Sequence, residues 1–426
     1  MTKREDGDTL PYTNDKEKND KNDKNETKVI EKKEIEKRRE VLYKNKKRLI
    51  IIGLAVAAVI FLVVFFAVGG YEKILDLFGI ERDVEVTPTV LSVEAEIKGT
   101  PLLAGKGGVA IVYDEQGVTG YGSDGKWKWH IECSVSNPTF TDCGDFAVIA
   151  DIGGTAAYAF NKNGAVWKYG SGNVIKSVFG RGKYICIVHE EKEYLSAATV
   201  YEFDAKTSSL KELFTRKFGS HYILTGAISK DCKQMVLSGV FSESGEARGS
   251  VSFIRLSDGE IFANEDVDNN IYVRMFYADN NTVFAANSDS VQTFYKSLSV
   301  STDGDKKSEL WGRNNMQSSI TDVAMVENKY CMVAIGNDNA EKTTVKAFDT
   351  SGNEKLNFEV SGNVIGVDAV GDTFLVYTDT HVSLYNSKGF FIGSAEAGFK
   401  IEHAVCTDSR NVAVCGEGKM LTISFN

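Results

Sequence analysis

The distribution of apolar residues divides the chain into three parts. Residues 49–68 read LIIIGLAVAAVIFLVVFFAV and contain no charged residue and no proline. A helix of this length rises about 30 Å, which matches the hydrocarbon thickness of a bilayer. Few apolar residues precede this run, whereas residues 84–426 contain many short apolar runs. The pattern predicts a transmembrane helix at 49–68, joined by a linker at 69–83 to a large C-terminal domain.

Short runs rich in Val, Ile, Phe, Tyr and Thr alternate in this domain with clusters of Gly, Asn, Asp and Ser, which is typical of antiparallel strands. One turn recurs, with a bulky apolar residue, three mostly polar or small residues and then Gly. It is complete at 121–125, 160–164, 300–304, 348–352 and 385–389, and altered at 203–207 and 256–259. Gly supplies the positive φ that such a turn needs, and Asn or Asp bonds to the nearby backbone.

The spacing of this turn indicates the fold. Its first residues, with Phe425 as the eighth, lie 39, 43, 53, 44, 48, 37 and 40 positions apart. A period near 40 is typical of four-stranded propeller blades. We therefore predict an all-β, eight-bladed β-propeller over residues 84–426, with seven blades as the alternative. The bulky turn residue should end each third strand. The fourth strand should pack through residues such as Trp127, Trp129, Trp167, Trp311, Leu356 and Phe358.

Each period opens with an apolar run expected to form the inner strand, and a second run follows. The expected inner strands are Pro101–Ala104, Thr139–Thr141, Val174–Phe179, Ile223–Ile228, Ile271–Phe276, Ile320–Met325, Val364–Val370 and Ile401–Cys406. The expected second strands include Phe146–Ala150, Tyr184–Val188, Met235–Val240, Val283–Ala286, Tyr330–Ile335, Phe374–Thr378 and Val412–Cys415. The last period lacks a fourth strand, so we expect Val84–Ile97 to complete it. Closure of this kind removes exposed sheet edges.

Charge predicts the topology of the chain. Lys44, Lys46, Lys47 and Arg48 abut the apolar run, and a cationic flank stays in the cytoplasm. The N-terminus is thus expected inside the cell and the C-terminal domain outside. Residues 1–26 are predicted to be disordered and residues 27–48 to form a charged helix. The long leading arm and long apolar run favour an uncleaved anchor over a signal peptide. The amphipathic segment Tyr71–Ile80 is either an interfacial helix or a spacer.

The net charge disfavours one class of partner. Residues 1–48 hold 16 basic and 12 acidic side chains, residues 69–83 hold two and four, and the whole chain holds 49 and 59. Residues 84–426 therefore carry a net charge of −12. An acidic domain repels nucleic acid, so we expect no nucleic-acid partner. Mild acidity also keeps a domain soluble.

No motif with recognisable chemistry is present. The seven cysteines form no CxxC and are expected to be buried free thiols on strands, with Cys133/Cys143 and Cys406/Cys415 the only close pairs that could bridge. The five histidines, which are His130, His189, His221, His381 and His403, do not cluster. Residues 105–108, 153–154 and 303–305 are interpreted as turns. We therefore predict no catalytic, cofactor-binding or metal-binding residue and no cofactor.

At its recurring turns the sequence resembles the PQQ-like and WD40-like bacterial β-propellers, which have a similar Asp/Asn-x-x-Gly turn and a Trp-bearing outer strand. The whole arrangement is similar to an uncharacterised family of membrane-anchored propellers from Gram-positive bacteria. The resemblance implies a propeller and says little about function. Quinone-dependent enzymes of this superfamily usually need adjacent cysteines, which are absent here.

These observations leave two functional hypotheses. The first is a non-enzymatic binding or scaffold module, anchored in the membrane, for protein or cell-envelope ligands. The alternative is an extracytoplasmic enzyme, quinoprotein-like or a hydrolase, with its site at the propeller axis. Converging carboxylates, Arg or a metal in an open funnel would favour the enzyme, and an exposed apolar patch on one face would favour binding. Candidate binding segments are the long loops expected between second and third strands, at Glu190–Ala197, Ser242–Ser250 and Asn337–Glu341.

Overall fold

The computed structural model describes Lys44 and residues 86–93, 97–170, 172–296, 309–316, 318–326, 330–336 and 341–426. Residues 82–426 form one compact unit and residues 1–81 form another. In the described part of the chain, no helix is long and apolar enough to cross a bilayer. Apart from Lys44, the predictions for residues 1–48, 49–68 and 69–83 lie outside the described residues.

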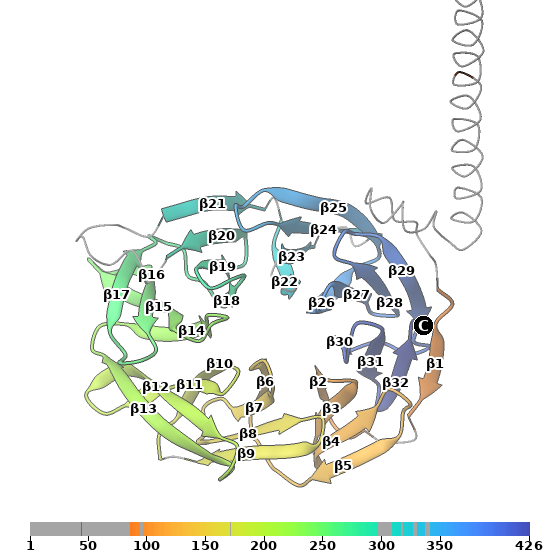
Figure 1. The fold of residues 1–426 in the computed structure, drawn as a ribbon, viewed down its shortest axis with the longest axis horizontal. Helices are drawn as coiled ribbons and strands as arrows, with labels where there is room; N and C mark the ends of the chain where they lie inside the picture. The colour runs from red at the N-terminus through yellow and green to blue at the C-terminus, as the bar shows by residue number, and fades with distance from the viewer. Residues whose placement is uncertain are drawn as a thin grey trace, which may run out of the picture. The chain divides into compact units, whose positions relative to one another are not determined.

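Residues 86–426 form eight antiparallel sheets of four strands, arranged as the blades of a propeller (Figure 1). In the first seven blades the four strands follow one another from the axis to the rim. Blades 1 and 2 contain β2 (Leu102–Lys106), β3 (Val109–Asp114), β4 (Gly117–Gly122), β5 (Trp127–Ile131), β6 (Pro138–Asp142), β7 (Ala147–Asp151), β8 (Ala156–Asn161) and β9 (Gly164–Gly170). Blades 3 and 4 contain β10 (Ile175–Arg181), β11 (Tyr184–Glu191), β12 (Tyr194–Asp204), β13 (Ser209–Phe218), β14 (Tyr222–Ile228), β15 (Gln234–Glu243), β16 (Glu246–Arg255) and β17 (Ile261–Asp266).

The other half of the ring continues in the same order. Blades 5 and 6 contain β18 (Arg274–Tyr277), β19 (Thr282–Ala286), β20 (Ser290–Tyr295), β21 (Glu309–Asn315), β22 (Ile320–Val326), β23 (Tyr330–Ile335), β24 (Lys342–Phe348) and β25 (Glu354–Ser361). Blades 7 and 8 contain β26 (Val364–Val370), β27 (Thr373–Thr378), β28 (His381–Asn386), β29 (Phe391–Glu396), β30 (His403–Cys406), β31 (Asn411–Gly416), β32 (Lys419–Ser424) and β1 (Thr89–Ser92). The prediction of eight blades is confirmed, and each expected inner and second strand overlaps an observed one.

The first described strand closes the ring. In blade 8 the order is β1-β32-β31-β30, so β1 is the outer strand of a sheet whose other strands end the chain. Thr89 lies opposite Ser424 and Ser92 lies opposite Leu421. The expected closing role of Val84–Ile97 is thus confirmed. Because this strand comes from the other end of the sequence, the eighth blade links the two ends of the propeller.

The recurring turn connects third and fourth strands as predicted. Its bulky residue is buried in most blades, as at Tyr121, Phe160, Leu256, Phe348 and Phe425. In blade 5 the third strand, β20, ends at Tyr295, and the expected turn at 300–304 lies outside the described residues. The expectation that outer-strand tryptophans pack is wrong for Trp127, which is 63% exposed on β5, whereas Trp167 on β9 is buried.

The hydrophobic core lies between neighbouring blades. Val188 and Phe179 of blade 3, for example, pack in one cluster with Ile223 and Leu237 of blade 4. Burying each such side chain stabilises the fold by roughly 1.5–3 kcal/mol.

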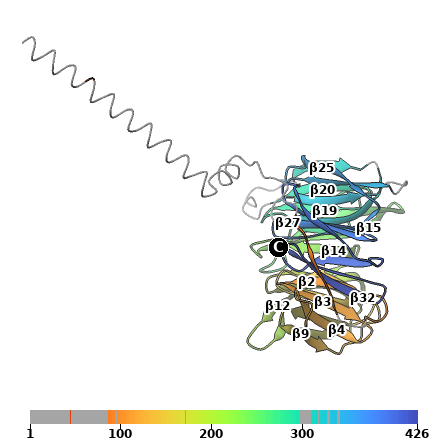
Figure 2. The ribbon, with the colours of Figure 1, turned by 90° about the vertical axis from the view of Figure 1, so that its right-hand side faces the viewer.

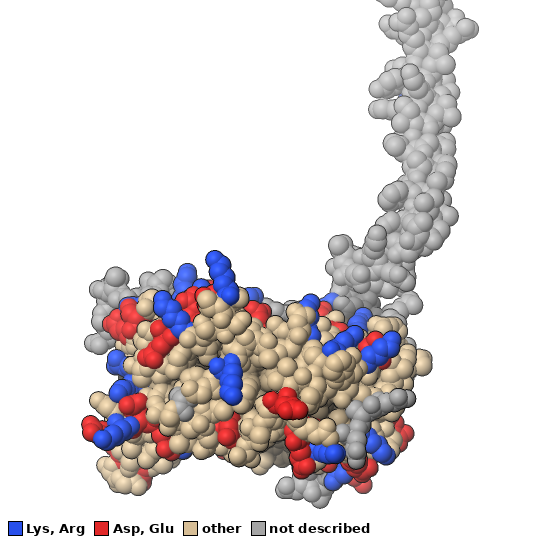
Figure 3. Space-filling model, turned by 90° about the horizontal axis from the view of Figure 1, so that it is seen from below, with Lys and Arg blue, Asp and Glu red and all other residues tan. Residues whose placement is uncertain are grey.

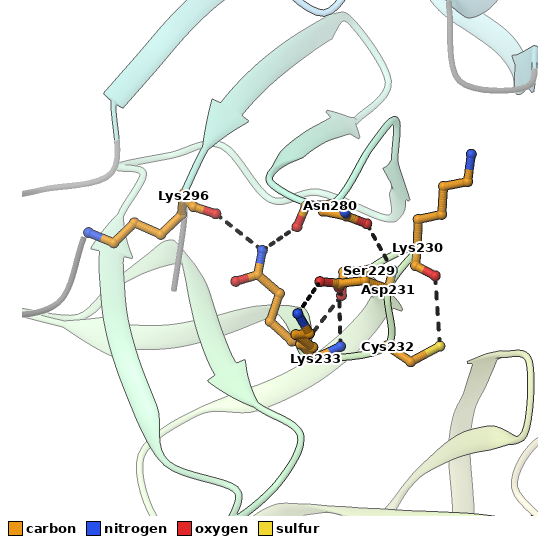
Figure 4. Close-up of polar contacts among 8 residues, drawn as sticks. Ser229, Lys230, Asp231, Cys232, Lys233, Asn280 and Lys296 are labelled. Atoms are coloured by element: carbon orange, nitrogen blue, oxygen red, sulfur yellow. Dashed lines mark hydrogen bonds and ion pairs between the residues drawn. The ribbon is translucent and has the colours of Figure 1, made fainter. Parts of the chain in front are cut away.

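Polar contacts join blades as well (Figure 4). Buried Gln234 on β15 donates from Nε2 to the carbonyl oxygens of Asn280 and Lys296, at 2.6 and 3.1 Å. Asn280 Oδ1 accepts a bond of 2.8 Å from the backbone N–H of Asp231. Blades 4 and 5 are therefore fixed to each other by hydrogen bonds as well as by apolar contacts.

Strand direction defines two faces of the propeller. Turns between second and third strands, and the links between blades, lie on one face, which we call the hairpin face. Turns between first and second strands and between third and fourth strands lie on the other, which we call the entry face. Val86, the first described residue of the propeller, donates its backbone N–H to the Ile392 carbonyl near this entry face. Phe425 donates to the Arg410 carbonyl there, and Figure 2 shows the C-terminus on the same side.

Candidate ligand-binding surface

Two inner-strand carboxylates at the axis serve to join blades. Asp322 on β22 accepts backbone N–H groups from Val323 at 2.9 Å and from Val367 of the next blade at 3.1 Å. Asp368 on β26 accepts the N–H of Cys406 of blade 8 at 2.7 Å. The unpaired edge of an inner strand would otherwise leave these N–H groups without partners. Both side chains thus close the ring between blades 6, 7 and 8.

Burial of these carboxyls changes their ionisation. Loss of hydration raises the pKa of Asp368 to about 7, and it also raises the pKa of Asp322. Within the described residues no group of three or more His, Cys, Asp or Glu side chains could hold a metal ion. At the axis Asp322 and Asp368 bond to the backbone of the next blade, and nearby the Lys106 ammonium on β2 lies 2.7 Å from the Asp142 carboxylate on β6.

Two hairpins of the hairpin face are longer than their counterparts. Strands β11 and β12 in blade 3 are 8 and 11 residues long, and β15 and β16 in blade 4 are 10 residues each. We predicted long loops at Glu190–Ala197 and Ser242–Ser250, and this is wrong in detail. The extra residues continue the strand ladder to the pair Glu243 and Glu246, because both sides find pairing partners. Ser244 and Gly245 both have positive φ, as a tight two-residue hairpin turn requires.

Hydrogen bonds hold the bases of these hairpins against the inner strands that follow them. Ser196 Oγ on β12 donates to the His221 carbonyl at 2.9 Å and accepts the Ile223 N–H at 3.2 Å. Ser238 Oγ on β15 donates to the Tyr272 carbonyl at 2.7 Å. These bonds place the starts of β14 and β18 beside the two hairpins.

Exposed aromatic and apolar side chains lie on this face of the propeller. Tyr194, Tyr222 and Val273 are 43%, 53% and 51% exposed. They stand at the start of β12, at the start of β14 and just before β18, so all three lie on the hairpin face of blades 3, 4 and 5. The His221 ring packs 5.0 Å from Phe241 beside them, and burial lowers the pKa of His221. We call Tyr194, His221, Tyr222, Phe241 and Val273 the hairpin platform.

Ion pairs surround the platform. Lys217 Nζ lies 3.0 Å from Glu191 Oε1 and 5.3 Å from the centre of the Tyr194 ring, and the bond to Glu191 raises the pKa of Lys217. Arg248 Nη1 lies 3.0 Å from Glu243 Oε2 and 2.9 Å from Asp266 Oδ2. Exposed pairs of this kind add little stability, but they orient both hairpins. Exposed apolar side chains with charged neighbours of this kind are typical of protein-binding sites.

A shallow hollow of about 880 Å³ lies on the entry face between blades 2 and 3. Phe146 and Phe203, whose ring centres are 5.3 Å apart, contribute to its lining. Its charged lining residues are three acidic and three basic ones, which are Asp145, Glu202, Asp204, Lys183, Lys206 and Lys211. Figure 3 shows both signs of charge interspersed on the rim that carries β5, β9 and β13. The hollow therefore favours neither an anion nor a cation.

The cysteines and histidines give mixed outcomes. All seven cysteines are free, so neither candidate pair is bridged. Cys133 and Cys232 are half-buried and lie in loops, and Cys143 is buried but also lies in a loop, between β6 and β7. His189 is buried and hydrogen-bonds to Thr199 Oγ1 at 2.8 Å, and His130 contacts Thr119 Oγ1 at 2.8 Å. The Gly-rich segments 105–108 and 153–154 do include turns between strands, as predicted. Residues 303–305 and 337–340 lie outside the described residues.

Sequence reasoning found only part of the platform. Tyr194 falls within the candidate segment Glu190–Ala197, but Tyr222 and Val273 were not singled out. Tyr222 belongs to the apolar run that forms β14, where its position at the strand end, not its residue type, leaves it exposed. The sequence signal that could have indicated the exposure of Tyr222 is its position directly after the link between blades at Gly219–His221.

Comparison with known proteins supports the fold. Sqt1 of Saccharomyces cerevisiae is similar in structure, with a TM-score of 0.55, 11% identity, and coverage of 80% of this chain and 99% of that one. Sqt1 of Chaetomium thermophilum has a TM-score of 0.51 and 13% identity, and the match covers 80% of this chain and 98% of that one. BamB of Moraxella catarrhalis has a TM-score of 0.49 and 12% identity, and the match covers 80% of this chain and 99% of that one. No curated protein matches the chain in sequence. The model of a family of unknown function, DUF5711, matches residues 92–425, so the chain belongs to this family.

Proposed function

We propose that the protein is a membrane-anchored, extracytoplasmic β-propeller that binds a protein or cell-envelope ligand on its hairpin platform and catalyses no reaction. One observation carries the proposal. Three of the seven large hydrophobic side chains described as exposed lie on the hairpin face of blades 3, 4 and 5, where the hairpins of blades 3 and 4 are extended. Exposed apolar groups with a polar rim are typical of interaction sites on soluble domains.

Anchoring is supported by the sequence. The uncharged run 49–68 is long enough to span a bilayer, and the basic residues before it favour a cytoplasmic N-terminus. In this topology the propeller lies outside the cytoplasm, where its ligand would be an envelope protein or polymer. The acidic propeller is poorly suited to nucleic acid.

The enzymatic alternative has less support. Asp322 and Asp368 are the inner-strand carboxyls with raised pKa values, and both accept backbone N–H groups from the next blade. A catalytic carboxyl must reach the proton that it transfers. Substitution of Asp368 should therefore change stability before it changes any activity.

Cross-linking in intact cells tests the proposal. Tagged wild-type chain and the variant Tyr194→Ser/Tyr222→Ser/Val273→Ser would be treated with a short cross-linker, and their adducts would be compared. We expect an envelope component that is captured by wild type and depleted at least about tenfold in the variant, since central aromatic contacts carry about 2 kcal/mol or more each. The control is Leu213→Ser, an exposed apolar residue of β13 outside the platform.

Two outcomes would contradict the proposal. One is that wild type and the triple variant capture the same components equally. The other is that no envelope component exceeds the background of an untagged strain. Equal expression and equal Tm of the variants would show that lost capture does not reflect unfolding.

A further inference from the structure

The strand that closes the ring is also the exposed edge of its sheet. β1 pairs with β32 and is the outermost strand of blade 8 (Figure 1). All four of its residues are exposed, and they include the apolar Val90 and Leu91, at 43% and 38%. An exposed apolar edge strand is a template on which another strand can pair.

Charge distinguishes β1 from the other outer strands that the structure describes. The outer strands of blades 1 to 7 each contain a charged residue, for example Lys128, Lys168, Lys211, Glu265, Glu309, Glu354 and Glu396 in turn. β1 reads TVLS and contains none. Charged side chains on an edge strand oppose the addition of another strand. Seven outer edges of the propeller are therefore protected in this way, and the edge of blade 8 is not.

The hydrogen bonds beside β1 show which of its backbone groups face outward. Val93, directly after the strand, donates its N–H to the Met420 carbonyl on β32 at 3.0 Å. The direction of these groups alternates along an antiparallel strand, and the pairing of β1 with β32 has no register shift. Thr89 and Leu91 therefore bond to β32, whereas the N–H and C=O groups of Val90 and Ser92 point away from the sheet.

The side chain of Leu91 lies where blades 1 and 8 meet. Leu91 is opposite Thr422, which is two residues after Met420. Met420 packs with Tyr121 of blade 1, so Leu91 lies on the side of blade 8 that faces blade 1. Trp127, which is 63% exposed, pairs with Tyr121 and lies on the facing side of blade 1. The edge is therefore bordered by a second exposed apolar side chain.

We propose that the protein forms a twofold-symmetric dimer in which the β1 strands of two copies pair antiparallel and join their blade 8 sheets. Val90 of each copy lies opposite Ser92 of the other, because in this register both outward residues of one β1 pair with outward residues of the other. Each of these pairs exchanges both N–H···O bonds. Leu91 then faces Leu91 of the second copy at the twofold axis, as a non-hydrogen-bonded pair whose side chains are close together.

Charge favours a second copy over a different protein as the occupant. In a twofold contact each surface meets itself, so a charge at the axis would oppose an identical charge. The propeller is acidic, and β1 supplies the uncharged strand that contact between two acidic copies needs. A partner of opposite charge would find no charged side chain on β1 to bind. Because both copies use the same edge, association stops at two.

The dimer leaves the hairpin platform uncovered. Blade 4 lies across the ring from blade 8 (Figure 1), so the platform of blades 3 to 5 is remote from β1. The inference therefore does not depend on ligand binding at the platform.

Cysteine cross-linking of the full chain in intact cells tests the register. In Leu91→Cys the two Cα atoms should lie about 4.5 Å apart, within the range of about 4.4–6.8 Å for a disulfide. In Thr89→Cys, the matched control on the same side of the same strand, they should lie roughly 14 Å apart. Two differently tagged copies would be co-expressed, oxidised briefly with diamide and separated without reductant. The wild-type chain, whose seven cysteines are buried or half-buried, gives the background.

We expect Leu91→Cys to join the two tags at least about tenfold more than Thr89→Cys, because the control thiols are too far apart to form a disulfide. The wild-type chain should give no more of this adduct than Thr89→Cys does. Dithiothreitol should release the joined copies.

A charge exchange at the same position gives an independent measurement. Leu91→Glu and Leu91→Lys each place like charges opposite each other at the twofold axis, which destabilises a cross-strand pair. Co-purification of the two tags should therefore fall to background in either variant alone. Co-expression of a Leu91→Glu copy with a Leu91→Lys copy should restore it, and a folding defect would not be restored in this way.

Four results would overturn the inference. Cross-linking at position 91 that is no greater than in the wild-type chain, or that is equally strong at position 89, would exclude the proposed register. A Leu91→Cys adduct with a different chain would identify another protein as the occupant. Co-purification that persists in Leu91→Glu alone would show that association does not use β1. Capture of an envelope component by the platform is measured separately, so failure of either proposal leaves the other standing.

Discussion

The carboxylate of Asp368 on β26 accepts a hydrogen bond of 2.7 Å from the backbone N–H of Cys406 on β30, across the boundary between blades 7 and 8. The charges of Asp142 on β6 and Lys106 on β2 act on Asp368, and the charges of Asp322 and Asp368 both act on Tyr377. Burial outweighs all of these influences and raises the pKa of Asp368 to about 7. The ring is therefore joined at this point by a group that titrates near neutrality.

This ionisation makes stability depend on pH. The folded-state pKa of Asp368 is above the ordinary value of 3.8, so its contribution is fully present below about pH 3.8 and is lost as the pH rises to about 7. The difference corresponds to at most about 4 kcal/mol. Asp368→Asn should remove the part of the pH dependence of stability that comes from this carboxyl. Tm should then fall less between about pH 5 and about pH 8 than in wild type. Asp145→Asn, at an exposed position, is the control, and equal pH slopes in wild type and Asp368→Asn would contradict the prediction.

Gly105 should tolerate no side chain. A Cβ built on this β2 residue would lie 1.9 Å from the carbonyl oxygen of Cys406, where blades 1 and 8 meet. Gly105→Ala must push these inner strands apart and should cost about 1–3 kcal/mol of unfolding free energy. Gly170→Ala is the matched control, because nothing lies within 4 Å of its Cβ. Chemical denaturation measures both, and similar midpoints for the two variants would refute the proposed steric conflict.

The hydrogen bonds of Gln234 between blades 4 and 5 should contribute measurably to the free energy of unfolding. Gln234→Leu removes both bonds from the buried Nε2 and leaves the carbonyl oxygens of Asn280 and Lys296 without these donors. We expect a loss of about 1–3 kcal/mol in unfolding free energy. Gln116→Leu, at an exposed turn position, should change it by less than about 0.5 kcal/mol. A loss no greater than that of the control would show that the contact does not stabilise the pair of blades.

Removal of β1 should open the ring. The fragment 86–426 keeps the four-stranded blade 8, whereas the fragment 93–426 loses the strand that pairs with β32. An unpaired sheet edge promotes association between molecules. We expect the shorter fragment to unfold at a lower temperature and to elute as larger species in size-exclusion chromatography. Identical Tm values and monomeric elution of both fragments would argue against closure by this strand.

The sequence was sufficient for the fold because the recurring turn depends on local backbone requirements. The blade count and the closing strand followed from the spacing of residues such as Tyr121, Phe160 and Phe348, which the structure buries. The spacing of the turns did not predict which side chains of the outer strands are exposed. Trp127 and Trp129 are two residues apart in similar surroundings, but a register shift beside Tyr121 separates them. Trp129 then stacks on Phe160, whereas Trp127 stays outside.

The candidate site depends on contacts between blades, which no single repeat encodes. Tyr194, Tyr222 and Val273 belong to three successive blades, whose hairpin faces are held next to one another by the bonds of Ser196 and Ser238 across the blade boundaries. The same holds for Asp322 and Asp368, which look like ordinary strand residues in sequence. Their partners, the N–H groups of Val367 and Cys406, are 45 and 38 positions away.

Site-specific photo-cross-linking from position 222 tests the central claim most directly. A photoreactive amino acid would replace Tyr222 on the hairpin platform or, as the control, Leu213 on β13, in the full chain in intact cells. The account predicts that position 222 yields one dominant adduct with an envelope protein or polymer, which position 213 does not yield. Adducts that are absent at position 222, or equally abundant at both positions, would contradict it.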